Sequence, residues 1–253
     1  MRLAAWNVNS LKIRLPQLVD WIAIARPDVL CLQETKIEDQ SFPLTEIKSA
    51  GYQAVYSGQK TYNGVAILSK EQGKETVAAI PEFNDTQKRV LAATIDDVRV
   101  ICVYAPNGQS VDSEKYRYKL EWFAKFNDWL KAELARHPQL AVLGDLNIAP
   151  EDRDVYDPKA WEGNVLVSPQ ERDAFRELLK AGLKDSFRLF DQPEKSFSWW
   201  DYRLGAFRRN LGLRIDHILL SSALAQRCKS STIDIKPRKA ERPSDHAPVM
   251  AEI

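Results

Sequence analysis

Residues 140–148 are LAVLGDLNI, an apolar run that ends in an acidic and an amide side chain. The run is short and rich in Leu, Val and Ile, which predicts a β-strand. Asp145 and Asn147 lie at its carboxyl end, two residues apart, and in an extended chain such residues point to the same side. The stretch therefore predicts a strand that carries two polar side chains to one rim of a sheet.

The same pattern occurs twice more along the chain. Asn7 and Asn9 follow LAAW, and Glu34 and Lys36 follow VLCLQ. A carboxylate directly after an apolar strand needs a cation or hydrogen-bond donors nearby. Layered α/β folds gather active-site side chains at the carboxyl ends of their strands. We therefore expect the three pairs to meet, although a strand ending in a solvated turn would explain any single pair.

Apolar segments recur through the whole chain and alternate with helical patterns. Strands are expected at 2–8, 28–34, 64–69, 90–95, 98–105, 140–148, 196–202, 214–221, 231–236 and 249–253. Helical spacing of apolar residues is found at 15–26, 113–136 and 168–182. About ten strands are too many for one ordinary open sheet, so two packed sheets with helices outside are expected. No linker or repeat divides the chain, which predicts a single domain over residues 1–253.

Composition restricts the class of protein. The formal net charge of +1 gives no overall electrostatic indication of a nucleic-acid partner. Three cysteines without CxxC spacing favour a reducing compartment, and Cys31 and Cys102 are expected to be buried strand residues. The apolar run before Asn7 is too short for a signal peptide or a membrane span, so a cytoplasmic protein without a membrane association is expected.

The polar pairs favour a particular kind of metal. They supply carboxylates and amide carbonyls, and no Cys or His cluster accompanies them. Such oxygen ligands suit a hard divalent cation, which predicts Mg²⁺, with Mn²⁺ as a substitute, and disfavours zinc.

The chain has three histidines, and one of them stands out. His246 lies between Pro243 and Pro248, which stiffen the loop around it. His217 adjoins Asp216 on an expected strand, so the two side chains should point to opposite faces. We therefore expect Asp216 to pair with His246 and to favour its charged form, while His217 is structural.

Eight motifs occur in order: WNVNS, LQETK, YNGVAILS, VYAPNG, GDLNIAP, SFSWWDYR, GLRIDHILLS and PSDHAPV. Together they resemble the exonuclease/endonuclease/phosphatase superfamily, and more closely exonuclease III and related abasic-site DNA repair nucleases. The resemblance extends from Arg2 to Glu252. It implies a four-layered α/β sandwich, in which two packed mixed β-sheets are flanked by helices. The pattern SWWDYR…GLRID disfavours RNA deadenylases, inositol-phosphate phosphatases and sphingomyelinases, which share the Glu, Asp and His core.

The resemblance also implies roles for individual residues. Glu34 would be the main metal ligand, with Asn7, Asn9 and Asp245 near the metal. Catalysis would involve Asp145 as acid/base, the Asp216–His246 pair, and Asn147 and Tyr104 at the phosphate; Tyr104 as a phenolate is a rival for activating the water. Substrate contacts are expected from Lys36, Asn63, Arg89, Asn107, Trp199, Leu213 and Ile215. Arg203, Arg208 and Arg209, with Phe207 as a wedge, form a loop that could reach DNA, although a solvated basic loop is the alternative.

The implied activity is that of a Mg²⁺-dependent phosphodiester hydrolase in base excision repair. It would cut 5′ to abasic sites in double-stranded DNA and would also act as a 3′–5′ exonuclease and a 3′-phosphodiesterase or 3′-phosphatase. Its partner would be DNA with abasic sites or damaged 3′ ends, and the enzyme would be a monomer associated with the nucleoid in the cytoplasm. A non-catalytic DNA-binding member of the family is a rival, although every expected catalytic position is filled.

One segment departs from the family pattern. Before PQER the family commonly has a small residue followed by an aromatic one, whereas this chain has Leu166 and Val167. The resemblance implies a pocket for the base-less sugar, walled by Trp199, Leu213 and Ile215. A bulky side chain at the rim of this pocket would hinder DNA that continues in both directions. The alternative is therefore an enzyme that mainly processes 3′ ends and incises internal abasic sites weakly.

Overall fold

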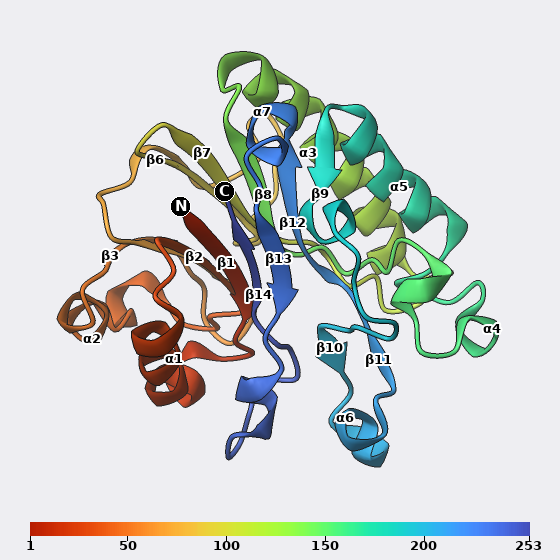
Figure 1. Ribbon diagram of the computed structural model, residues 1–253. Coiled ribbons are helices and arrows are strands. Elements are labelled where there is room, and N and C mark those ends of the chain that lie inside the picture. Colours follow the sequence, from red (N-terminus) through yellow and green to blue (C-terminus); the bar gives the residue numbers. More distant parts are fainter.

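The computed structural model describes residues 1–253, and two six-stranded sheets form its centre (Figure 1). The first sheet has the order β13 (Ser230–Ile233), β14 (Val249–Glu252), β1 (Arg2–Asn7), β2 (Val29–Gln33), β4 (Val65–Ser69), β3 (Gln53–Ser57). The second has the order β5 (Lys74–Val77), β6 (Val90–Ile95), β7 (Val98–Tyr104), β8 (Leu140–Asp145), β12 (Asp216–Ser221), β9 (Leu183–Asp185). Both sheets are mixed, because parallel and antiparallel pairs occur in each.

Helices cover the outer faces of the two sheets (Figure 1). Helices α1 (Leu11–Ala25) and α2 (Leu44–Ser49) pack on the first sheet, and α3 (Glu114–Arg136) and α5 (Pro169–Lys180) pack on the second. A third apolar cluster lies between the sheets and includes Cys31 and Cys102, both fully buried. The expected four-layered sandwich is therefore confirmed.

The capping residues of two long helices follow from the sequence. Ser113 accepts a hydrogen bond from the backbone of Tyr116 at the start of α3. At the start of α5, Ser168 and Glu171 form a reciprocal capping box, with Pro169 as the first helical residue. Both predicted helices are confirmed. No helix in the structure combines the length and the apolarity that a membrane crossing requires.

The expected strands form, but one of them is much shorter than predicted. Only Trp199–Trp200 of the segment 196–202 is a strand (β10), and it pairs with β11 (Gly212–Leu213) in a separate ribbon. The Ser198 hydroxyl binds backbone N–H groups of the segment 215–216, and a 3-10 turn begins at Arg203. Strands β3, β5, β9 and β11 were not expected, because β3 and β5 are not continuous apolar runs and the other two have only two or three residues. The remaining short helices are α4 (Pro158–Trp161), α6 (Ala206–Arg209) and α7 (Ser222–Ala225).

The pairing of the strands places several strand ends at one edge of the sandwich. Strands β1 and β2 are parallel, and Asn7 lies opposite Gln33 at their carboxyl ends. Strands β7 and β8 are also parallel and end with Tyr104 opposite Asp145. Strand β12 runs the other way and begins with Asp216 opposite Asp145. Polar residues from both sheets therefore meet at this edge.

Candidate active site

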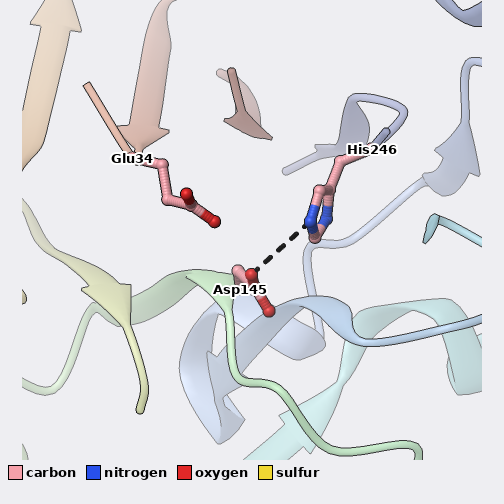
Figure 2. A group of neighbouring side chains, drawn as sticks. All are labelled: Glu34, Asp145 and His246. Carbon is pink, nitrogen blue, oxygen red and sulfur yellow. Dashed lines mark ion pairs between the residues drawn. The ribbon is translucent and has the colours of Figure 1, made fainter. Parts of the chain in front are cut away.

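Side chains from both sheets converge on Asn7. Its amide nitrogen donates to Glu34 Oε1 and to Asp145 Oδ2, at 2.9 Å in each case. Asn7 is fully buried and Asp145 is 1% exposed, so these hydrogen bonds form in a site with little water. Figure 2 shows Glu34, Asp145 and His246 pointing toward a common centre from three separate segments. The expectation that the polar pairs meet is thereby met for Asn7, Glu34 and Asp145, and Lys36 adds contacts to Glu34 and Asn9.

The reason for this convergence differs from the one that the sequence suggested. Glu34 lies beyond the end of β2, and its φ of 51° is in the left-handed region. Asn9, Lys36 and Asn147 have φ values of 42°, 53° and 50°. The second residue of each pair therefore belongs to a turn, and the alternation of an extended strand does not apply. The Asn9 and Asn147 backbone N–H groups instead fold back onto the side chains of Asn7 and Asp145.

Asp216 and His246 form the expected pair. His246 Nδ1 lies 2.9 Å from Asp216 Oδ2, and Ser198 donates to the same oxygen at 2.6 Å. Burial alone would lower the pKa of His246, but the carboxylates of Asp216 and Asp145 outweigh it and raise the pKa to about 10. The imidazole is therefore charged at neutral pH, and its Nε2 faces Asp145 Oδ2 at 3.8 Å.

Two further groups at this centre have shifted pKa values. Burial raises the pKa of Asp145 to about 7, against the opposing effects of the His246 charge and the Asn7 amide. Burial also raises the pKa of Tyr104 well above its usual range, and the charges of Glu34 and Asp145 add to the shift. The Tyr104 hydroxyl is thus held as a neutral phenol, which disfavours a phenolate as the group that activates water.

The loop that carries His246 is held by residues that sequence reasoning missed. Ser244 donates to the Asn7 carbonyl at 2.6 Å and accepts from the His246 N–H at 3.2 Å. Trp6 donates to the His246 carbonyl at 3.2 Å. Ser244 and Trp6 both lie within the quoted motifs, but only the pairing of β1 with β14 brings the two ends of the chain together. Figure 1 shows these ends side by side.

The donor set fits a hard divalent cation. Glu34 and Asp145 each offer a carboxylate oxygen, and these atoms lie within 4.8 Å of each other and of His246, whose charged imidazole is not itself a ligand. Lys36 Nζ lies 2.8 Å from Glu34 Oε2, so a cationic group already neutralises this carboxylate. The polar-pair pattern included the Asp145 carboxylate among the possible oxygen ligands, whereas the family resemblance implied an acid/base role for it. It takes this position because β1 and β8 end at the same edge.

Asn9 and Asp245 are in contact at one side of this centre. Asn9 donates to Asp245 Oδ1 at 2.9 Å, and Trp199 Nε1 donates to Asp245 Oδ2 at 3.0 Å. Both Asp245 oxygens therefore accept from protein donors. Lys36 also donates to the Asn9 side chain. This arrangement connects Lys36 and Asn9 to the aromatic residue Trp199 through Asp245.

Three residues expected to contact the substrate line one groove beside Tyr104. Asn63, Arg89 and Asn107 surround a cavity of about 630 Å³. Arg89 lies over the Tyr104 ring at 4.8 Å, and Asn107 donates to the Asn147 side chain at 3.2 Å. The groove thus borders Tyr104 and lies between the β3–β4 loop, which carries Asn63, and the loop after β7, which carries Asn107.

The other expected contacts lie on the opposite side of the centre. Trp199 is half-buried and packs with the buried residues Leu213 and Ile215 in a small apolar cluster. Arg208 is exposed on α6, which projects from the sandwich with β10 and β11 (Figure 1). Phe207, the expected wedge, instead packs on Trp200 with the rings 5.1 Å apart. The ring is partly exposed, and its packing on Trp200 supports this loop.

His217 points away from the catalytic centre, as expected. Its Nε2 lies 2.9 Å from the Ile148 carbonyl, and its Nδ1 lies 3.0 Å from Arg214 Nη1. Arg214 in turn binds Asp154 at 2.7 Å and Asp185 at 2.8 Å. Burial, together with the Arg214 charge, lowers the pKa of His217 to about 4. His217 is therefore a neutral structural residue.

This shift predicts a pH dependence of stability. Between pH 6.5 and pH 4 the unfolded chain binds a proton at His217 and the folded chain does not, so acid favours unfolding. The contribution from His217 should fall by about 2 kcal/mol between pH 7 and pH 5. Urea unfolding should show a smaller loss over this interval in His217→Gln than in the wild type. An equal loss in both proteins would show that His217 is charged when folded.

The sequence profile of the Endonuclease/Exonuclease/phosphatase family matches residues 4–246. Exodeoxyribonuclease III of Haemophilus influenzae is 38% identical over 265 residues, which cover all of this chain and 99% of that protein.

Two solved structures have nearly the same fold. The 3′ phosphatase NExo from Neisseria, bound to a product DNA hairpin, is 46% identical, with a TM-score of 0.98 over 100% of this chain and 99% of that one. An AP endonuclease from Archaeoglobus fulgidus is 38% identical, with a TM-score of 0.96 and the same coverage of both chains.

Proposed function

The chain belongs to the Endonuclease/Exonuclease/phosphatase family, and we propose that it is a Mg²⁺-dependent enzyme that cuts DNA 5′ to abasic sites and trims damaged 3′ ends. It is an exonuclease III-like phosphodiester hydrolase, a DNA repair nuclease. The cluster of Asn7, Glu34 and Asp145 beside the Asp216–His246 pair carries the proposal. We expect the enzyme to act as a monomer on chromosomal DNA in the cytoplasm.

The proposed chemistry assigns a separate task to each group. Asp145 takes a proton from the attacking water. The charged imidazole of His246 donates to a non-bridging phosphate oxygen, where negative charge increases in the transition state. One hydrogen of the Asn147 amide binds the Ala105 carbonyl at 2.9 Å, which leaves the other for a phosphate oxygen. The neutral phenol of Tyr104 provides one more donor beside the phosphate.

Glu34 is the proposed main metal ligand, with Asn7, Asn9 and Asp245 close to the ion. Asp145 also offers an oxygen, and Asn7 orients both carboxylates through its amide. When bound, Mg²⁺ supplies positive charge that stabilises the leaving 3′ oxygen. Binding of the ion would require Lys36 to release Glu34 and to contact the DNA backbone instead.

The substrate is best tested with three labelled duplexes: one with an internal abasic site, one with a recessed 3′ end and one with a 3′-phosphate at a nick. The proposal expects cleavage of all three, complete loss in EDTA, and recovery with Mg²⁺ or Mn²⁺. The Mg²⁺ requirement would be refuted by cleavage that persists in EDTA. The proposed substrate class would be refuted by an enzyme that leaves all three duplexes intact.

Leu166 supports a second candidate, an enzyme that mainly processes 3′ ends. Its side chain is 4% exposed, and its φ of 76° is in the region that favours glycine. The backbone of this segment is tied down, because the Leu166 carbonyl accepts from Ala149 at 2.8 Å. We propose that a leucine here, where related proteins commonly have a small residue, narrows the rim of the pocket for DNA that continues past it. The similar Neisseria protein is described as a 3′ phosphatase.

Leu166→Gly should shift the balance between the two activities. It removes the side chain and relieves backbone strain, so incision at internal abasic sites should rise about tenfold relative to removal of a 3′-phosphate. The ratio of kcat/KM values on the two duplexes measures this change. Val165→Ala, one residue earlier in the same segment, should leave the ratio unchanged. A constant ratio in Leu166→Gly would remove this residue as a determinant of specificity.

A further inference from the structure

A fully buried ion pair lies directly behind the proposed phosphate site. Lys119 of α3 and Glu171 of α5 are both 0% exposed, and Lys119 Nζ lies 2.5 Å from Glu171 Oε1. Removing two charges from water is costly, and such a pair persists only when further hydrogen bonds satisfy its remaining donors and acceptors. The other partners of the two side chains therefore indicate what the pair holds in place.

The Lys119 ammonium also donates hydrogen bonds to two loops of the candidate active site. Its ammonium donates to the Asn107 carbonyl at 3.1 Å and to the Asn147 carbonyl at 2.6 Å. With Glu171, these contacts use all three donors of the ammonium group. The side chains of Asn107 and Asn147 bind each other at 3.2 Å on the substrate side. Lys119 thus fixes the backbone from which both amides project.

Glu171 connects the pair to the segment that contains Leu166. Its Oε1 accepts from the Leu166 N–H at 3.0 Å, and its Oε2 accepts from the Ser168 N–H at 3.1 Å and from the Ser168 hydroxyl at 2.6 Å. Tyr116 of α3 also contacts the Ser168 hydroxyl, at 2.6 Å. One buried pair therefore joins the rim beside Leu166 to the two asparagines at the phosphate.

Stability alone does not require charges at this position, because well-packed apolar side chains can often replace a buried ion pair without loss. The contacts of the pair are directional and end on active-site carbonyls. We propose that Lys119 and Glu171 are positioning residues of the reaction. They hold Asn107 and Asn147 so that their amides face the phosphate, and they couple this geometry to the Leu166 segment. This inference rests on the proposed function of Asn147.

The same helix provides a matched control. Arg99 and Glu133 form a second buried pair, 2% and 0% exposed, with Nε and Oε2 2.6 Å apart. Arg99 otherwise contacts the Glu75 carbonyl and Thr94, neither of which lies at the active-site edge. Glu133 is 14 residues from Lys119, roughly 20 Å along the axis of α3. The two pairs share their chemistry and differ in what they hold.

The test compares Lys119→Met/Glu171→Gln with Arg99→Met/Glu133→Gln. Each double variant removes both charges, so that no unpaired charge is left buried. After correction for the folded fraction, the first variant should lose about 30-fold in kcat on the 3′-phosphate duplex, with KM changed less than threefold. The second should keep kcat within twofold even where its melting temperature falls. Equal kcat values in the two variants would overturn the proposal.

Two further measurements make the result decisive. Should the first double variant fail to fold, Glu171→Gln alone should lose about fivefold in kcat, whereas Glu133→Gln should not. Side-chain amide resonances of Asn107 and Asn147 in ¹⁵N-labelled protein should shift in Glu171→Gln and remain unchanged in Glu133→Gln. Unshifted resonances would refute the positioning role. The spectra need no turnover, so a wild type that cleaves none of the duplexes would refute the proposed function alone.

Discussion

Asp145→Asn should lower kcat about 10³-fold while DNA binding stays close to that of the wild type. The substitution removes the group that takes the proton from water, and general-base catalysis of this kind contributes about 10²–10⁴-fold. The asparagine oxygen can still accept from the Asn147 N–H, which Asp145 Oδ1 binds at 2.9 Å, so the loop should keep its shape. Single-turnover rates on the 3′-phosphate duplex, with a separate DNA-binding titration, measure the two quantities.

Two other variants make this result specific. Tyr104→Phe should cost only about tenfold, since burial and the nearby carboxylates keep the phenol neutral. Asp185→Asn replaces another buried aspartate, one that binds Arg214 and no group of the proposed catalytic centre. Its main effect should be a lower free energy of unfolding, with little change in kcat. Near-normal turnover in Asp145→Asn, together with its abolition in Tyr104→Phe, would transfer the role of the base to Tyr104.

His246→Asn and Asp216→Asn should each lower kcat about 10²-fold, and the double variant should be little worse than either single one. Asp216 acts by orienting the imidazole and by raising the pKa of His246. Once the imidazole is removed, loss of Asp216 should therefore lower kcat little further. The double-mutant cycle measures this coupling directly. Losses that multiply in the double variant would show that the two residues act independently.

The neighbouring histidine is the natural control for this cycle. His217→Gln changes a buried histidine that adjoins Asp216 in the chain but binds Ile148 and Arg214. It should lower the free energy of unfolding and leave kcat nearly unchanged. A loss of kcat as large as that of His246→Asn would mean that the general rigidity of β12, rather than the charge at His246, controls the reaction.

Local signals in the sequence predicted most of the regular structure. The capping box at Ser168 and Glu171 marked the start of α5, and the apolar spacing marked α3 over nearly its full length. The extent of ribbon β10–β11 could not be predicted from local sequence. The Ser198 hydroxyl accepts hydrogen bonds from backbone N–H groups of residues 215 and 216, which are distant in the chain. A strand of two residues has no period of its own, and its partner alone defines it.

The candidate site shows the same division. The motifs brought out Asp145, Glu34 and His246 as residues with demanding chemistry, and the alternation rule assigned His217 to the opposite side from Asp216. The rule was wrong for Glu34 and Lys36, because both have left-handed backbone conformations just beyond β2. A turn of this kind depends on hydrogen bonds to other segments, such as that from Thr35 to Gly64, which no local pattern contains.

By itself, the sequence determined which side chains this protein can use and which elements carry them, because helix caps, apolar periods and acidic strand ends are local properties of the chain. Tertiary structure alone decided which of these side chains meet. Asn7 bridges two sheets, and Lys119 reaches loops far from it in the chain. Strand register and the burial of charge set these contacts, and both depend on residues that are distant in sequence.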